Sequence, residues 1–350
     1  MDNPSSIDST LLLPVLPCTP SSDSYNCLVI AGGATKCIAV LGALHYLQLT
    51  NIKNYAGTSA GGILSYFLAI GYTPFEIMHF ICSSNFIDEF QNLNIAGVVE
   101  KKGLINYYII QDYLEKLTLN KIGYLPTFKD ISTKMGVHLT VVSYNLTKNQ
   151  VEYLNVDTQP DMPCLTALRM TSNVPLLFER FFYNNCEYLD GGLVDNFPID
   201  LFSDSLKYKP LGIDIISVDT SVDTSISREN NYIIYLLRVA MIPYNFFHAQ
   251  KSYPSNSTVI QINPGLKSFD FNLSISKRLN LFSAGYQTAK SFFNPPKGQE
   301  EEENETEAEA NESVESVESA ETTESVESAE ESKDEDIIQT EEVILKVKLD

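Results

Sequence analysis

The chain has 350 residues and a formal net charge of −21, from 45 acidic and 24 basic residues. The charge is uneven: residues 298–350 hold 21 of the acids and 3 of the bases, which leaves 24 acids and 21 bases in the first 297 residues. A nearly neutral body with an acidic end argues against nucleic acid as a partner, because a phosphate backbone would repel it.

Two further absences narrow the class of protein. No stretch of eighteen apolar residues occurs, so no membrane-spanning helix is expected. The six cysteines form no C-x-x-C pair, and no metal-ligand cluster is visible, so reduced thiols are expected instead of a disulfide scaffold or a metal site. We expect a cytoplasmic protein that can bind membranes at their surface.

The first motif follows a short apolar run at residues 27–31, which predicts a strand. Gly32 and Gly33 end this run, and apolar residues then recur at helical spacing over residues 38–49. A strand, a glycine turn and a helix start leave backbone N–H groups unpaired around one point, which suits an anion or an oxyanion. The turn comprises Gly32, Gly33, Ala34, Thr35 and Lys36. It is not G-x-G-x-x-G, so a dinucleotide phosphate site is the weaker alternative.

The second motif lies between a strand-like run at residues 54–56 and an apolar helical run at residues 61–70. It reads Gly57-Thr58-Ser59-Ala60-Gly61, which is a G-x-S-x-G pattern. Between a strand and a helix this pattern places the serine on a sharp turn that exposes its hydroxyl. The motif therefore predicts Ser59 as a nucleophile.

The third motif is Asp190-Gly191-Gly192, at the end of a strand predicted over residues 187–189. An acid held at a strand end could orient or deprotonate a serine. The alternative is an ordinary Asp-Gly turn.

Strand-like and helical runs alternate along the remaining chain, which favours an α/β fold. The other strands are predicted at residues 138–145, 151–155, 212–218 and 258–262, and the other helices at 75–82, 106–117, 165–171, 232–242 and 276–292. Residues 1–24, rich in Ser, Pro and Asp, are expected to be flexible, and residues 296–340 to form a disordered acidic low-complexity tail. Residues 341–350 alternate like a short strand. The tail either keeps the chain soluble, regulates its approach to anionic membranes, or recruits a basic partner.

Together the three motifs resemble those of the patatin-like phospholipase family: a Gly-rich oxyanion segment, a G-x-S-x-G turn and an aspartate in D-G-[GA]. The resemblance continues over residues 167–175, over D-G-G-L-V-D-N-F-P at residues 190–198, and into a closing helix at residues 269–293. It covers residues 27–293. The family pattern G-G-G-x-[KR]-G has Ala34 in place of its third glycine and Cys37 in place of its last, and we expect Cys37 to be the larger departure.

The resemblance implies a three-layer α/β/α fold with a central, mostly parallel sheet, formed by a hydrolase domain of residues 25–295. It implies a lipid acyl hydrolase, of phospholipase A type or a related esterase, that acts on lipid at a membrane surface. Ser59 would attack the ester carbonyl, and Asp190 would accept its proton and later activate water. The N–H groups of residues 32–36 and of Ala60 would hold the oxyanion, and no cofactor or metal would be required.

Two alternatives remain open. Cys37 favours a weak or inactive member of the family that binds a membrane or a partner protein. A triad of Ser59, Asp190 and His248 would also satisfy the chain order of an α/β-hydrolase. Apolar residues for membrane contact are available at 232–242, with Tyr244, Phe246 and Phe247 beyond them, and at 80–90, unless both stretches are core helices.

Overall fold

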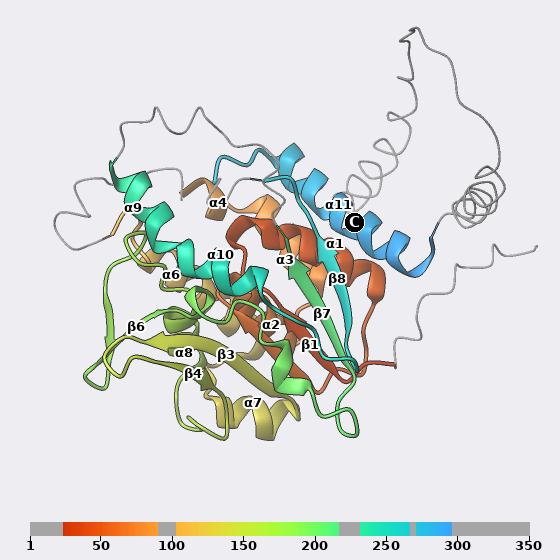
Figure 1. Ribbon diagram of the computed structural model, residues 1–350, viewed down its shortest axis with the longest axis horizontal. Coiled ribbons are helices and arrows are strands. Elements are labelled where there is room, and N and C mark those ends of the chain that lie inside the picture. The colour runs from red at the N-terminus through yellow and green to blue at the C-terminus, as the bar shows by residue number, and fades with distance from the viewer. Residues whose placement is uncertain (1–23, 90–102, 217–231, 267–270, 296–350) are drawn as a thin grey trace, which may run out of the picture. The chain divides into compact units, whose positions relative to one another are not determined.

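The computed structural model describes residues 24–89, 103–216, 232–266 and 271–295 (Figure 1). The expectations for residues 1–23 and 296–350, including the acidic tail and the final strand, concern residues outside these ranges. The cysteines in the described ranges are all free thiols. Of the helices in these ranges, none combines the length and the apolar character needed to cross a bilayer.

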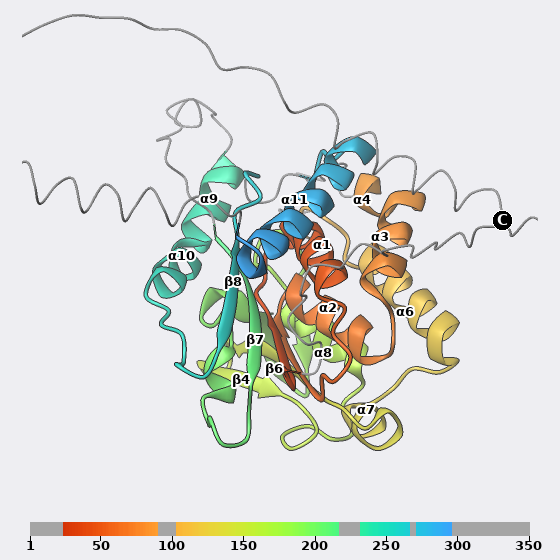
Figure 2. The same cartoon turned by 90° about the vertical axis from the view of Figure 1, so that its right-hand side faces the viewer.

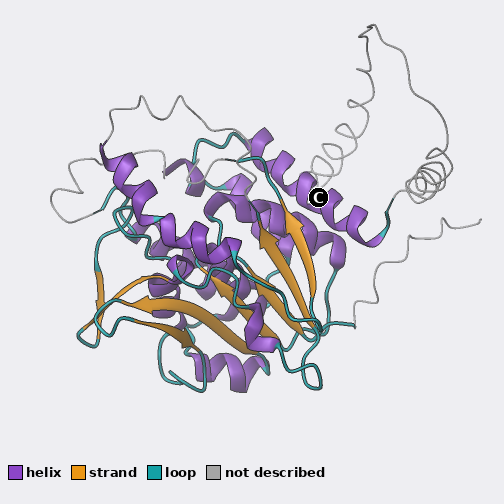
Figure 3. Ribbon diagram, in the orientation of Figure 1, coloured by secondary structure: helices purple, strands orange, loops and turns teal. Residues whose placement is uncertain are grey.

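An eight-stranded sheet forms the centre of the fold (Figure 3). Its strands are β1 (Cys27–Ile30), β2 (Asn54–Thr58), β3 (His138–Asn145), β4 (Gln150–Leu154), β5 (Phe181–Tyr183), β6 (Cys186–Asp190), β7 (Pro210–Ile215) and β8 (Thr258–Ile262). The order is β5-β6-β3-β2-β1-β7-β8, with β4 also paired to β3. The run β3-β2-β1-β7-β8 is parallel, whereas β4, β5 and β6 pair in antiparallel fashion at one end. This confirms the predicted α/β class with a mostly parallel sheet.

Helices cover the sheet. They are α1 (Cys37–Leu47), α2 (Ala60–Ala69), α3 (Pro74–Ser83), α4 (Phe86–Glu89), α6 (Tyr108–Ile122), α7 (Phe128–Met135), α8 (Cys164–Thr171), α9 (Tyr232–Ala240), α10 (Ile242–Ala249) and α11 (Ile275–Phe293). Short 3₁₀ turns are η1 (Ala34–Lys36), η2 (Gly191–Leu193) and η3 (Ile199–Phe202). In Figure 2, α1, α2, α3, α6 and α11 lie on one side of the strands, and α9 and α10 lie on the other.

The sequence patterns did not predict α4, α7 or β5 as separate elements. The start of α7 has a recognisable signal, because Thr127 and Asp130 form a capping box in which each side chain accepts a hydrogen bond from the other residue's backbone N–H. Gly136 then ends the helix in a left-handed conformation. Both signals are legible in the sequence, whereas the three-residue β5 has no periodicity to detect.

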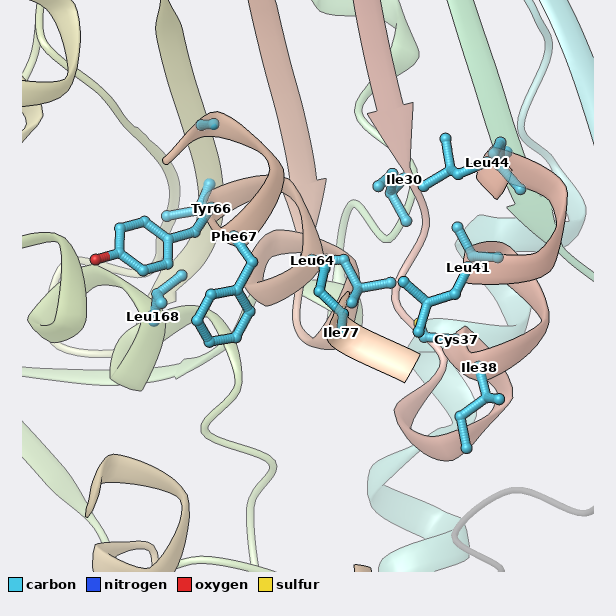
Figure 4. Packing of buried hydrophobic residues seen from close by; sticks show 14 of the residues in the cluster. Ile30, Cys37, Ile38, Leu41, Leu44, Leu64, Tyr66, Phe67, Ile77 and Leu168 are labelled. Atoms are coloured by element: carbon cyan, nitrogen blue, oxygen red, sulfur yellow. The ribbon is translucent and has the colours of Figure 1, made fainter. Parts of the chain in front are cut away.

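Strand β1 is buried on both of its faces, as expected for a parallel strand between two layers. Leu28 and Ile30 face the larger core, whereas Cys27 and Val29 face a smaller one. Figure 4 shows Ile30 of the larger core beside α1, α2 and α3, with Leu41, Leu64 and Ile77 among the packed side chains. The smaller core is completed by Phe197, Ile199 and Phe202, from the segment that follows η2.

Helix α11 packs closely against α1 (Figure 2). The backbones touch at Gly285, where an added Cβ would lie 1.7 Å from the carbonyl oxygen of Ala39. Only glycine fits such an approach. Because α1 begins directly after η1, this contact also fixes the glycine turn that precedes it.

Candidate active site

The sheet register brings the second and third motifs to the same level. Thr58 ends β2 opposite Val142 of β3, and Asp190 ends β6 opposite Ser143, the next residue of β3. Ser59 is the residue directly after Thr58. Two residues that are 131 positions apart in the sequence therefore become neighbours through their shared partner β3.

Ser59 lies on a strained turn between β2 and α2. Its backbone has φ 55° and ψ −128°, a sparsely populated combination that costs on the order of 1–3 kcal/mol for a residue with a Cβ. The Ser59 N–H donates to Oγ1 of Thr171 at 3.0 Å, and the Thr171 hydroxyl donates in turn to the carbonyl of Val142. The turn is closed by Gly61, where a Cβ would lie 2.3 Å from the carbonyl oxygen of Ile30. This is the sharp turn that the G-x-S-x-G motif predicts.

The Asp190 carboxylate is buried beside Ser59, with 4% of the residue exposed. Its Oδ1 accepts a hydrogen bond from the Gly192 N–H at 2.7 Å. Burial raises the pKa of Asp190 from 3.8 to about 7, against the opposing effects of the Ser59 hydroxyl and the Gly192 N–H. Oδ2 has no partner with regular hydrogen-bond geometry among the described residues. The Ser59 hydroxyl is thus near enough to influence the carboxylate but is not in a regular hydrogen bond with it, as is common in catalytic pairs without substrate.

The first glycine turn supplies N–H groups near the same place. Among the described residues, the backbone N–H groups of Gly33 and Ala34 have no hydrogen-bond partner. The start of α2 at Ala60 adds N–H groups that have no acceptor within the helix. Thr35 and Lys36 complete the turn, and both side chains are buried.

The backbone reverses the expected ranking of the two departures from the family pattern. Ala34 has φ 49°, in the left-handed region that glycine adopts without cost. Cys37 has φ −62°, which any residue adopts in a helix, and its thiol donates to the carbonyl of Ala31 at 3.6 Å. Burial also raises the pKa of the Cys37 thiol to about 12, which keeps it protonated. Strain therefore falls on Ala34, and Cys37 fits its position.

All three motifs open onto one cavity of about 210 Å³. The predicted residues on its wall are Gly32, Gly33, Ala34, Thr35, Lys36, Ser59, Ala60, Asp190 and Gly192. Gly57, Thr58, Gly61 and Gly191 are not on the wall and serve as the backbone behind it. Most of the remaining wall is apolar and comes from helices α1, α2, α3 and α6.

His248 lies with a different acid. Its Nε2 is 3.4 Å from Oδ1 of Asp214, and its ring stacks on Tyr244 with centroids 5.5 Å apart. His248 is not on the wall of the cavity that contains Ser59 and Asp190, although Tyr244 is. The geometry therefore pairs this histidine with Asp214 and gives the triad no support.

Two residues that hold the site in place were not assigned a role from the sequence. One is Thr171, the acceptor for the Ser59 N–H. The other is Asn196, which makes two hydrogen bonds to Gly32. Its side-chain Nδ2 donates to the Gly32 carbonyl at 3.0 Å, and its backbone carbonyl accepts from the Gly32 N–H at 3.2 Å. Their positions in the sequence were the available signal for a role at the site. Thr171 lies in the stretch 167–175 before Asp190, and Asn196 lies in the stretch 190–198, which begins with Asp190.

One family model and several known proteins are similar to this chain. A model of the family described as patatin-like phospholipase matches residues 28–203, half of the chain. A probable lipid hydrolase, 463L of Invertebrate iridescent virus 6, is 35% identical over 192 residues, which are 53% of this chain and 64% of that protein. The uncharacterized protein R571 of Acanthamoeba polyphaga mimivirus is 27% identical over 284 residues, which are 77% of this chain and 94% of that one. Among solved structures, VipD from Legionella pneumophila matches with a TM-score of 0.48 and 18% identity, over 77% of this chain and 67% of that chain.

Proposed function

Since the chain belongs to the patatin-like phospholipase family, we propose that it is a lipid acyl hydrolase with Ser59 as nucleophile and Asp190 as base. The observation that carries this proposal is the meeting of a strained serine, a buried carboxylate and unpaired N–H groups on one apolar cavity. Each is of little meaning alone, but together they supply the parts of an acyl-transfer reaction.

In the proposed reaction, Ser59 Oγ attacks the carbonyl carbon of a fatty-acyl ester and its proton passes to Asp190. The carbonyl oxygen becomes an oxyanion held by the N–H groups of Gly33, Ala34 and Ala60. The C–O bond to the alcohol then breaks, and the alcohol leaves with the proton from Asp190. Water next loses a proton to Asp190 and attacks the acyl-serine, which releases the fatty acid and restores the Ser59 hydroxyl.

The environment of Asp190 supports its role as a base. An ordinary carboxylate is too weakly basic to deprotonate a serine hydroxyl efficiently. Burial raises the pKa of Asp190 to about 7, which brings it closer to the pKa of the serine hydroxyl. Above pH 7 the Asp190 carboxylate is still largely ionised and can accept a proton. The N–H groups and the dipole at the start of α2 compensate for the remaining weakness, because they stabilise the charge that develops in the transition state.

The shape of the cavity supports an acyl ester as substrate. From Ser59, helix α2 presents Ala60, Ile63, Leu64 and Phe67 to the cavity at helical spacing. Helix α6 faces it with Ile110, Tyr113, Leu114 and Leu117 at the same spacing. The eight residue-to-residue steps from Ser59 to Phe67 span about 12 Å along the helix, roughly the length of an extended ten-carbon acyl chain.

Labelling with a fluorophosphonate probe tests the nucleophile directly. The wild-type chain should be labelled, and Ser59→Ala should not. Release of fatty acid from phosphatidylcholine and from a decanoate ester should disappear in both Ser59→Ala and Asp190→Asn. Retained hydrolysis in His248→Ala would agree with the dyad, and loss of hydrolysis in a folded His248→Ala would favour the triad.

Failure of the wild-type chain to react with the probe would refute the enzyme assignment. The protein would then be an inactive member of the family that binds membranes or partners. Backbone strain at Ala34 would be the first candidate cause of the lost activity. In that case Ala34→Gly, which restores the glycine of the family pattern, is the variant to test for recovered labelling.

A further inference from the structure

Helices α9 and α10 carry an unusual concentration of exposed apolar side chains. Fifteen large apolar side chains are exposed in the described part of the chain, and five of them lie within residues 235–247. They are Tyr235 (58% exposed), Val239 (41%), Ile242 (59%), Phe246 (55%) and Phe247 (46%). Single exposed apolar residues need no explanation, but a contiguous group of this kind marks a binding surface. We call these five side chains the α9–α10 face.

The spacing of the α9–α10 face shows that it is one side of a helical segment. Tyr235, Val239, Ile242 and Phe246 follow one another at intervals of four, three and four residues. Met241 and Tyr244, also from this segment, line the catalytic cavity. The segment therefore has an inner side that forms part of the cavity wall and an outer apolar side.

The inner side contacts the loop of residues 191–196, which follows Asp190. Helix α10 packs against η2, directly after Asp190, and Asn196 Nδ2 lies 3.4 Å from the Tyr244 hydroxyl. Helices α9 and α10 lie together on the side of the sheet away from α1 and α3 (Figure 2). Whatever binds the outer side is thus brought next to the site of the proposed chemistry.

The charge of the segment favours a lipid partner. Residues 232–250 contain no aspartate or glutamate, and Arg238 is their one residue of fixed charge. Arg238 is exposed beside Val239, and the next cation, Lys251, is paired with Asp195 and Asp200 at 3.0 and 2.6 Å. A helical segment with exposed aromatic side chains, no carboxylate and a single arginine suits the interface of a zwitterionic bilayer.

The second stretch that the sequence offered for membrane contact is residues 80–90, of which Phe90 lies outside the described residues. In residues 80–89 the large apolar side chains point inward, because Phe80, Ile81, Phe86 and Ile87 all line the cavity. Of the two stretches, the α9–α10 face is the one whose described large apolar side chains are exposed next to the site.

From these observations we propose that the α9–α10 face docks the protein on a zwitterionic phospholipid bilayer, with α10 presenting the catalytic cavity to the membrane. The choice of lipid as partner rests on the proposed function. Binding itself is measured independently of hydrolysis, in the Ser59→Ala background.

The absence of tryptophan from the chain provides a clean probe. In Ser59→Ala, Phe246→Trp introduces a single indole on the α9–α10 face, and Phe182→Trp introduces one on β5, where the parent phenylalanine is equally exposed at 55%. With phosphatidylcholine vesicles, the emission of Phe246→Trp should move to shorter wavelength and become protected from acrylamide. The emission of Phe182→Trp should not change.

Flotation with the same vesicles measures the contribution of the face. Phe246→Ser in the Ser59→Ala background should lower the partition coefficient at least tenfold, whereas Leu206→Ser, at a position 99% exposed, should leave it unchanged. Binding should depend only weakly on salt, because residues 232–250 carry a single residue of fixed charge, Arg238. With Ser59 present, Phe246→Ser should still hydrolyse a soluble short-chain ester, which separates loss of docking from loss of the active site.

Three results would overturn the proposal. Equal spectral changes at positions 246 and 182 would mean that the vesicles contact no particular face. If the chain bound only anionic vesicles and salt abolished this binding, docking would depend on electrostatic attraction and not on the apolar face. A dimer of the Ser59→Ala chain that Phe246→Ser converts to a monomer would show that the face meets a second copy of the chain.

Discussion

Replacing Asp190 by asparagine should stabilise the protein while abolishing hydrolysis. Asparagine has the same shape, and its Oδ1 still accepts the Gly192 N–H. What it removes is a buried charge whose Oδ2 lacks a hydrogen-bond partner among the described residues. Active sites commonly retain groups of this kind at the expense of stability.

The size of the effect follows from the pKa. Burial raises the pKa of Asp190 from 3.8 to about 7, so between these values the folded protein holds a proton that the unfolded chain has lost. Stability therefore falls as pH rises through this window, and the cost is fully present above about pH 7. Three pH units at 1.36 kcal/mol each amount to about 4 kcal/mol.

The measurement is urea unfolding followed by circular dichroism, at pH 8 and at pH 4. Asp190→Asn should raise the free energy of unfolding by about 4 kcal/mol at pH 8 and by under ~1 kcal/mol at pH 4. Asp195→Asn is the matched control, because that carboxylate pairs with Lys251 at 3.0 Å and accepts the Tyr153 hydroxyl at 2.9 Å. Its replacement should destabilise the protein. An Asp190→Asn variant with no gain at pH 8, or with the same gain at both pH values, would refute the reasoning that burial raises this pKa.

Three further predictions concern the same site and its support. Hydrolysis of a soluble ester should fall about tenfold per pH unit below an apparent pKa of about 7, because Asp190 must be ionised to act as base, and a flat pH–rate profile would contradict this. Thr171→Val should lower kcat about tenfold or more and destabilise the fold by about 1–3 kcal/mol, since it leaves the Ser59 N–H unpaired, whereas Thr171→Ser should restore both. Gly285→Ala should lower the free energy of unfolding by about 3 kcal/mol, because the added Cβ meets the backbone of α1. Gly123→Ala is the control and should lower it by about 1 kcal/mol, because only a left-handed φ opposes alanine there. Equal losses in the two variants would show that α11 shifts to accommodate the Cβ.

Much of the fold was predictable because local patterns and tertiary environment agree. Strand β1 reads as a continuous apolar run and is buried on both faces, and the G-x-S-x-G sequence forms the turn expected of it. The three motifs could be recognised, and their roles in catalysis stay predictions. Their convergence was not derivable from spacing, because it depends on β6 pairing with β3 in a particular register.

Other features were beyond the reach of the sequence. The conformation of Ala34 could not be inferred, since alanine gives no sign of the positive φ that its turn imposes. Likewise, no local pattern identifies Thr171 as the acceptor for the Ser59 N–H, 112 residues away. Such contacts depend on how distant elements pack together, which cannot be inferred from any short stretch of sequence.

The two hydrogen bonds between Asn196 and Gly32, together with the place of Asp190 at the end of β6, give the intervening loop a fixed length. One end of the loop holds the proposed base, and the other end holds the turn that is proposed to receive the oxyanion. Inserting or deleting a single residue between them would move one of these groups relative to the serine. Related chains that retain this chemistry should therefore vary in length elsewhere and keep the number of residues between the aspartate and the asparagine constant.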